Sequence, residues 1–374
     1  MNVAKCIMQP LGTVDNFRIS ALRESRIKEG EVTFMRKGLR LFAVCALLAS
    51  TVVVAGSAHA QTKTGTTIGQ FLLVEPSARV SAMGNAGVTT FQEVQSGYYN
   101  PGALGHMDHS DVQVTRSTWL AGITYNYAAA ALRFGASNTL LLSVTALNSG
   151  EIDVRTVDQP MGTGERYSVS DIAFGLGYAR RITDRFSAGV RASYLQETIW
   201  HSSLSAFAFD FGVLYELPFR AYLGASISNF GTRGAYDGRD LAIRYDLDPN
   251  RFGDNSNVPA NIETENWPLP VLFRVGIGYP VLLNANNQVH FVVDAFQPSD
   301  NTESISMGAE WTFMELFSAR AGYQNLFQED SEGGLAAGAG LNVDISSYTA
   351  RIDYSWSAYG RLEYVQRFTV GFSF

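Results

Sequence analysis

The histidines are the first residues whose type and spacing could support metal or acid–base chemistry. His106 and His109 flank Asp108, and imidazole and carboxylate groups are common metal ligands. The two rings are three residues apart on an expected turn, with no cysteine or further histidine nearby, so we interpret them as surface groups. No Ser/His/Asp arrangement stands out elsewhere. We therefore expect no catalytic residue, no metal site, no cofactor and no enzyme activity.

A second chemically competent set consists of charged side chains that alternate with apolar residues along the chain. By this alternation, the following residues all fall on polar faces: Arg191, Asp210, Arg274, Asp294, Glu310, Arg320, Arg351, Asp353 and Arg367. Arginine binds carboxylates and backbone carbonyls with a rigid fork of N–H groups. We interpret the set as a polar network that fixes an internal segment to a wall. The alternative is a selectivity lining for a substrate.

The elements that must position these charges are β-strands. In the segment 169–181, Phe174 and Leu176 share one face while Ala173 and Gly175 share the other. Similar alternation recurs in about fourteen segments. They cover residues 111–119, 122–134, 138–147, 169–181, 185–195, 204–216, 219–229, 270–279, 287–297, 303–313, 315–325, 334–344, 348–356 and 362–374.

The connections between these segments are alternately short and long. Those at 135–137, 183–184 and 346–347 are tight, whereas those at 148–168 and 230–269 are long. Outer-membrane barrels have short periplasmic turns and longer outer loops, and an even strand number returns both ends to the periplasm. The sequence therefore predicts an all-β fold, a 14-stranded antiparallel transmembrane β-barrel over residues 111–374.

The last segment ends on an aromatic residue. Phe368, Val370, Phe372 and Phe374 share one face, together with Tyr364. A terminal aromatic with apolar residues at every second position resembles the signal that the barrel-assembly machinery reads. We expect these residues to serve that role in a bacterial outer membrane, where lipid is the first partner of the apolar face.

The first 60 residues have the features of a removable export signal. A basic stretch begins at Met35, an apolar run follows, and Ala58, His59 and Ala60 fit a cleavage site, so residues 1–60 are expected to be an upstream extension plus signal peptide. Both cysteines lie in this part, and Lys63 is the only lysine beyond it. The remaining chain is acidic and unsuited to binding nucleic acid.

Residues 61–110 do not alternate and are rich in glycine, which favours tight turns and close packing. A barrel of this size has a lumen wide enough for water or a plug, so we expect this segment to be a plug, folded into the lumen at its periplasmic side. Its motif residues are Phe71, Ala78, Arg79, Met83, Gly84, Asn100 and Pro101.

This motif resembles the N-terminal signature of the PorV/PorQ family and, more distantly, the hatch of FadL-type fatty-acid transporters. The chain departs from the signature at Asn85 and Gly102, where glycine and alanine are usual, and at Gln92-Glu93, where paired aspartates are usual.

The resemblance implies a carrier in type IX secretion. Its implied partners are the secretion translocon, the attachment components and the C-terminal domains of cargo proteins. The alternative is a FadL-like transporter that binds hydrophobic small molecules. Aromatic residues in the long acidic connection, which are common interface anchors, are expected to contact a partner. They are Tyr236, Tyr245, Phe252 and Trp267.

Overall fold

The computed structural model describes residues 63–374 except 249, 251–252, 254, 256 and 329–330. The expected signal peptide and Phe252 lie outside the described residues. In the part of the chain that the structure describes, no helix is both long and apolar enough to cross a membrane.

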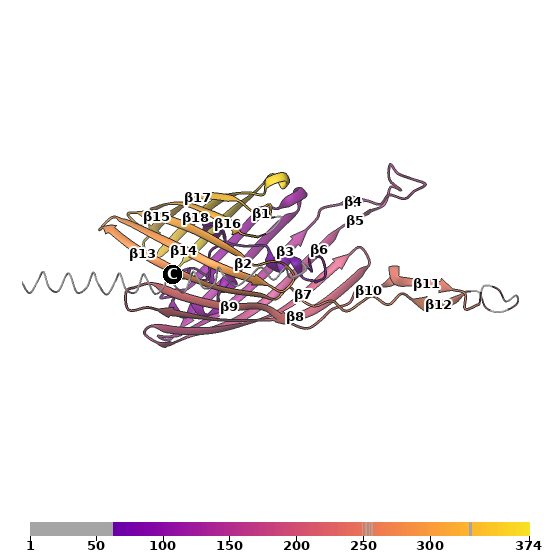
Figure 1. The fold of residues 1–374 in the computed structure, drawn as a ribbon, viewed down its shortest axis with the longest axis horizontal. Helices are drawn as coiled ribbons and strands as arrows, with labels where there is room; N and C mark the ends of the chain where they lie inside the picture. The colour runs from indigo at the N-terminus through magenta and orange to yellow at the C-terminus, as the bar shows by residue number, and fades with distance from the viewer. Residues whose placement is uncertain (1–62, 249, 251–252, 254, 256, 329–330) are drawn as a thin grey trace, which may run out of the picture. The chain divides into compact units, whose positions relative to one another are not determined.

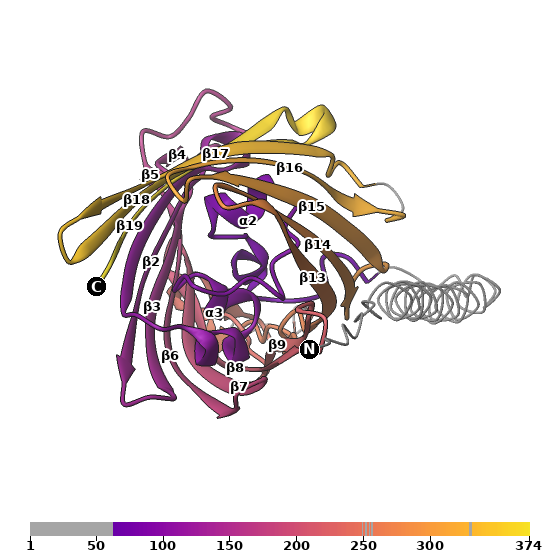
Figure 2. The ribbon, with the colours of Figure 1, turned by 90° about the vertical axis from the view of Figure 1, so that its left-hand side faces the viewer.

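Fourteen antiparallel strands close into a barrel (Figures 1 and 2). They are β1 (Asp111–Thr118), β2 (Thr124–Phe134), β3 (Asn138–Asn148), β6 (Val169–Thr183), β7 (Phe186–Ile199), β8 (Ser202–Glu216), β9 (Tyr222–Gly231), β13 (Leu272–Asn284), β14 (Asn287–Pro298), β15 (Ser304–Phe313), β16 (Phe317–Leu326), β17 (Leu335–Ile345), β18 (Tyr348–Ala358) and β19 (Tyr364–Ser373). The first and last strands pair directly, with Val114 opposite Val370, and β8 pairs with β9. The predicted barrel of fourteen strands is confirmed.

Alternation along each strand separates an apolar outer face from a polar or small inner face. On β6, Phe174 and Leu176 are 51% and 55% exposed, while Ala173 is buried. Successive side chains of a strand point to opposite faces, so a closed sheet sends one set outward and the other into the lumen. The sequence pattern therefore fixes which residues face the barrel interior.

Several strands differ from the predicted boundaries by two residues or more, and three of these differences have a local cause. Residues 280–286 were expected to connect two strands, but β13 continues through Pro280 to Asn284. Proline is tolerated there because β9 begins only at Tyr222, which pairs with Gly278, so Pro280 lies beyond the part of β13 that pairs with β9. β9 and β16 begin later than predicted, because Arg220 and Glu315 adopt positive φ in the preceding turns.

The long connections carry small sheets of their own. β4 (Ile152–Asp153) pairs with β5 (Arg166–Tyr167), and β11 (Ala242–Tyr245) pairs with β12 (Val258–Asn261). A short strand, β10 (Asp237–Gly238), pairs with the tip of β8 and leads into η4 (Arg239–Leu241). These hairpins project past the ring of strands at the long-loop end (Figure 1). The short connections lie at the opposite end of the strands, as the alternation of lengths predicts.

Short helical turns form the N-terminal segment, which we define as residues 63–110. They are η1 (Gln70–Leu73), α2 (Ala78–Ala82), α3 (Ser96–Tyr99) and η2 (Pro101–His106), while η3 (Leu120–Gly122) and η5 (Gly360–Leu362) connect strands at the long-loop end. Ser77 starts α2 by accepting a hydrogen bond from Val80 N at 3.2 Å. Asn100 starts η2 in the same way, with Pro101 at the first position of the turn.

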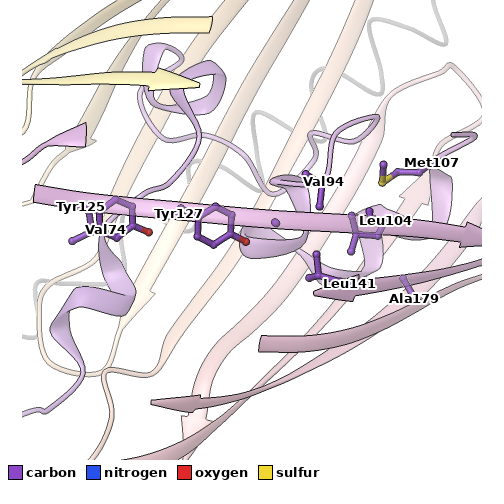
Figure 3. Packing of buried hydrophobic residues seen from close by; sticks show 10 residues of the cluster. Val74, Val94, Leu104, Met107, Tyr125, Tyr127, Leu141 and Ala179 are labelled. Carbon is purple, nitrogen blue, oxygen red and sulfur yellow. The ribbon is translucent and has the colours of Figure 1, made fainter. Parts of the chain in front are cut away.

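The N-terminal segment lies within the ring of strands (Figure 2) and packs on the inner faces of the strands. Figure 3 shows one buried cluster along β2, where Val94, Leu104 and Met107 of the segment meet Tyr125 and Leu141 of the wall. A second cluster joins the start of the segment to β7 and β8. Its members include Ile68, Phe71, Leu72, Leu195 and Leu204.

The segment runs along the whole length of the barrel. Gly69 N donates to Glu197 Oε1 at 2.8 Å near the long-loop tip of β7, whereas Ser187 Oγ, near the other end of β7, donates to Gly102 O at 2.6 Å. The segment was expected at the periplasmic, short-turn side of the lumen, and its later part around Gly102 does lie at the short-turn end, but its first part extends further. Its first residues lie at the long-loop end because Ile68, Phe71 and Leu72 find their apolar partners there.

Candidate functional site inside the barrel

An ion-pair network joins α2 to the barrel wall. Arg79 donates to both carboxylate oxygens of Glu310 on β15, with Nη2–Oε2 at 2.6 Å and Nε–Oε1 at 3.0 Å. Glu310 also accepts from Arg320 on β16 at 2.7 Å, and Arg320 reaches Asp353 on β18 at 2.5 Å. The side chains of Glu310, Arg320 and Asp353 are at most 5% exposed. Forked, charge-assisted bonds of this kind fix both distance and orientation.

Two acidic residues of the segment extend the network. Glu93 lies 3.4 Å from Arg351 Nη1 and 3.9 Å from Arg79. Glu75 lies 3.6 Å from Arg274 Nη2, and its carbonyl accepts from Arg367 Nε at 2.9 Å. Burial raises the pKa of both Glu75 and Glu93, and the neighbouring arginines oppose this by lowering it.

The other predicted charges also face the lumen. Arg191 pairs with Asp210 at 2.7 Å, and the Arg191 guanidinium lies 5.7 Å from the centroid of the Tyr98 ring. Asp294 on β14 accepts from Val88 N of the segment at 2.8 Å. All nine residues of the predicted set therefore point inward. Five of them form hydrogen bonds or ion pairs with the segment: Arg274, Asp294, Glu310, Arg351 and Arg367.

Asn100 anchors the turn between α3 and η2. Its Nδ2 donates to Val88 O and to Val213 O, both at 2.9 Å, so one amide ties two parts of the segment to β8. The turn fits only because the facing wall residues, Gly189 and Gly212, lack side chains, since a methyl group at either would overlap Pro101 or Asn100. The Asn-Pro motif therefore contacts the barrel wall.

Met83 and Gly84 form a second place where the segment lies close to the barrel wall. Gly84 has φ +70°, a conformation that favours glycine, and it lies against the main chain of Tyr323. Gly308 and Gly322 on the wall face the Met83 main chain, and a methyl group at either would overlap it. Phe71 and Ala78 are also buried, at 4% and 0% exposure. The motif residues are therefore those that let the segment approach the wall.

Sequence reasoning missed the acidic half of this network. Glu75 and Glu93 sit in the N-terminal segment, away from any alternating strand, so strand periodicity gave no reason to select them. The signal that could have identified these two residues is their charge. A segment inside a lumen lined by arginine needs carboxylates to pair with them, and these are among the few acidic residues that the segment contains.

The aromatic residues predicted to contact a partner do not form one cluster. Tyr245 is 52% exposed on the β11–β12 hairpin, and Trp267 is 36% exposed beside Gly234, with which it exchanges two backbone hydrogen bonds. Tyr236 is turned toward the wall, where its hydroxyl donates to Glu197 at 3.0 Å. Phe252 lies outside the described residues.

The C-terminal strand presents its aromatics outward. Phe368, Phe372 and Phe374 are 49%, 53% and 53% exposed, and Val370 lies on the same face. The interpretation of His106 as a surface group is wrong, because its ring is buried against the wall and bonded to Ser187 at 2.7 Å. His109 instead pairs with Asp108 at 2.6 Å. Over the described residues, no group of three or more His, Cys, Asp or Glu side chains converges on a point suited to a metal ion.

This architecture has the fold of the FadL-like barrels. The chain is similar in fold to the monoaromatic hydrocarbon channel CymD, with a TM-score of 0.53 and 11% identity over 80% of this chain and 97% of that one. It is also similar to a FadL homologue from Pseudomonas aeruginosa (TM-score 0.50, 10% identity, 80% and 98% covered) and to the toluene transporter TodX from Pseudomonas putida (0.50, 12%, 79% and 97%). A search of curated proteins gives no match.

The family follows from the sequence. Residues 57–297 match the family described as "Type IX secretion system protein PorV", and the chain belongs to this family. The resemblance that the N-terminal motif indicated is confirmed. The family and the fold are those of outer-membrane transport and secretion barrels.

Proposed function

We propose that the chain is a carrier of the outer membrane that binds secreted proteins and delivers them to the surface-attachment machinery of type IX secretion. Membership of the PorV family is the observation that carries this proposal. The signal peptide would export the chain, and the apolar outer face of the strands would contact lipid. No step of this function needs a catalytic residue.

The long-loop end is the part of the barrel suited to meeting cargo or translocon. Its hairpins extend past the wall, and Tyr245 and Trp267 remain accessible on them. Exposed aromatic residues supply large contact area at low entropic cost and often dominate binding energy. Tyr236 contributes indirectly, since its bond to Glu197 holds the base of this region to β7.

Affinity purification of the tagged full chain from outer membranes tests the carrier role. Secreted proteins and attachment components should co-purify with the wild type, and Tyr245→Ser with Trp267→Ser should reduce their recovery. Phe219→Ser is the matched control, since Phe219 is 55% exposed at the opposite, short-turn end. Recovery of no secreted protein or attachment component with the wild type would refute the carrier role.

We further propose that the N-terminal segment is a plug. The ion pairs and close glycine contacts that bind the segment along the wall support this proposal. In planar bilayers, a chain lacking residues 63–107 should conduct more than the intact protein. Equal conductance would refute the plug.

The second candidate is transport of hydrophobic small molecules. It is favoured by the similarity in fold to barrels described as a hydrocarbon channel and a toluene transporter. A lipid or hydrocarbon retained in the lumen of the purified protein, together with no bound secreted protein, would support this function over the carrier role.

A further inference from the structure

The outer face of the barrel wall is hollowed over β2, β3, β6, β7 and β8, which lie side by side (Figure 2). The hollow has a volume of about 690 Å³, within the range of sites that hold small ligands. Its floor is made by small outward side chains, Ala128 and Ala130 on β2 and Ala192 on β7. Larger apolar side chains surround this floor and are 48–55% exposed, so the chain itself leaves the hollow open. They include Leu142, Phe174, Leu176 and Phe207.

The hollow has a polar edge on its long-loop side. The outward side chains of β1 change there from Val114 to Arg116, and Arg116 lies opposite Asn126 on β2. Asn126 is two positions from Ala128 in the floor of the hollow, which is roughly 7 Å along a strand. A guanidinium and an amide therefore stand at the end of an apolar depression.

Arg116 has no counter-charge within the described part of the chain. Its side chain is exposed, no described carboxylate lies within ion-pair distance of it, and its neighbours on the same face are Asn126 and Phe368. The next outward pair, Thr118 and Thr124, is also polar. An arginine on the lipid face is costly at the bilayer centre and costs little at the interface, so this row belongs at the level of the lipid headgroups. Because long loops mark the outer end of such barrels, these are headgroups of the outer leaflet.

A phosphate group attached to an acyl chain suits both parts of the site. A guanidinium binds phosphate through two parallel N–H bonds, and the Asn126 amide can donate another. The chain attached to the phosphate would cover the alanine floor. Free phosphate would leave the hollow empty, and a plain hydrocarbon would leave Arg116 without an anion.

We propose that Arg116 and the hollow beside it form a binding site for a phosphorylated lipid of the outer leaflet. The phosphate lies on Arg116 and Asn126, and an acyl chain lies against Ala128 and Ala130. The site is on the outside of the wall, so it goes beyond the carrier role and does not depend on the plug. It rests on the outer-membrane location to which the family and the fold point.

Native mass spectrometry of the full chain in a mild detergent tests the proposal, with dipalmitoyl phosphatidic acid as the probe. Dipalmitoylglycerol is the matched lipid because it lacks only the phosphate. We expect the phosphatidic acid to bind at least about tenfold more tightly, the gain of charge-assisted hydrogen bonds. Inorganic phosphate at equal concentration should not compete. Equal affinity for the two lipids, or competition by inorganic phosphate, would overturn the proposal.

A charge variant locates the phosphate. Arg116→Gln should weaken binding of phosphatidic acid about tenfold and leave binding of dipalmitoylglycerol unchanged. Arg180→Gln is the matched control, since Arg180 is also exposed on the outer face but lies near the short-turn end of β6. Unchanged affinity in Arg116→Gln, or equal losses in the two variants, would contradict the assignment.

A filling variant locates the acyl chain. Ala128→Phe should weaken binding of both lipids, whereas Ala337→Phe, on the outward face of β17 and away from the hollow, should not. Gel filtration of the same proteins tests the other occupant, a second copy of the chain. If the wild type is an oligomer that Ala128→Phe dissociates, the hollow is an interface between copies and the lipid site is refuted. If Ala128→Phe does not fold, the comparison of Arg116→Gln with Arg180→Gln decides.

Discussion

Arg79 in α2 and Glu310 in β15 are 231 positions apart in the sequence, yet they form a forked ion pair with its closest contact at 2.6 Å. The pair is a bidentate, charge-assisted contact that holds the N-terminal segment against the wall. Glu310 also holds Arg320, so one carboxylate serves two guanidinium groups.

The shared carboxylate predicts unequal effects of substitution. Glu310→Gln leaves the buried Arg320 and the half-buried Arg79 without this partner. It should destabilise the barrel by about 3–5 kcal/mol, the cost of breaking a buried ion pair. Arg79→Gln should cost less, because Glu310 keeps Arg320. Urea-unfolding midpoints of the purified protein measure both. Equal losses would show that Arg320 does not compensate.

The glycine contacts predict a steric effect. Gly322→Ala should displace Met83 or prevent correct folding, because the added methyl group would overlap the Met83 main chain. We expect faster cleavage of the N-terminal segment in limited proteolysis. Gly334→Ala is the control, since its added methyl group would meet no atom closer than 3.8 Å. Identical cleavage rates in the two variants would contradict the contact.

His106 predicts a pH dependence of stability. Burial, with a smaller contribution from Arg181, lowers the pKa of His106 from 6.5 to about 4. Ser187 donates its hydroxyl proton to Gly102 O and so accepts from His106 Nδ1, which leaves the unpartnered Nε2 to take the second proton.

Between pH 6.5 and 4, His106 is therefore protonated in the unfolded chain but neutral in the folded chain. The stability that the neutral ring contributes to the folded state is lost as the pH falls through this range. The loss is at most about 3 kcal/mol. His106→Gln should remove that part of the pH dependence between pH 7.5 and 4.5, as measured by urea unfolding. An unchanged pH profile in the variant would contradict this role of His106.

The C-terminal aromatics predict an effect on assembly. Phe374→Ala should lower the folded fraction in the outer membrane several-fold, as judged by heat-modifiable migration in gel electrophoresis, if the assembly machinery reads this residue. Phe134→Ala is a suitable control because Phe134 also faces outward, at 50% exposure. Equal losses in the two variants would indicate loss of lipid contact rather than of a signal.

The sequence alone determined the barrel. Alternation of side chains is a local property of a strand, so residues such as Phe174 and Ala173 reveal their faces without any knowledge of their neighbours. The same property placed Arg274, Glu310 and Arg367 inside the lumen. Strand ends were less well determined, as Pro280 shows, because they depend on where the neighbouring strand stops.

Only the tertiary structure decided what those inward charges contact. Arg79 meets Glu310, and Glu93 meets Arg351, across more than half of the chain, and no local pattern specifies such a pairing. The path of the N-terminal segment was also decided there, since Glu197 and Ser187 bind it at opposite ends of β7. Periodicity assigns a side chain to a face, whereas a partner is assigned by closure of the sheet, which brings distant strands around one lumen.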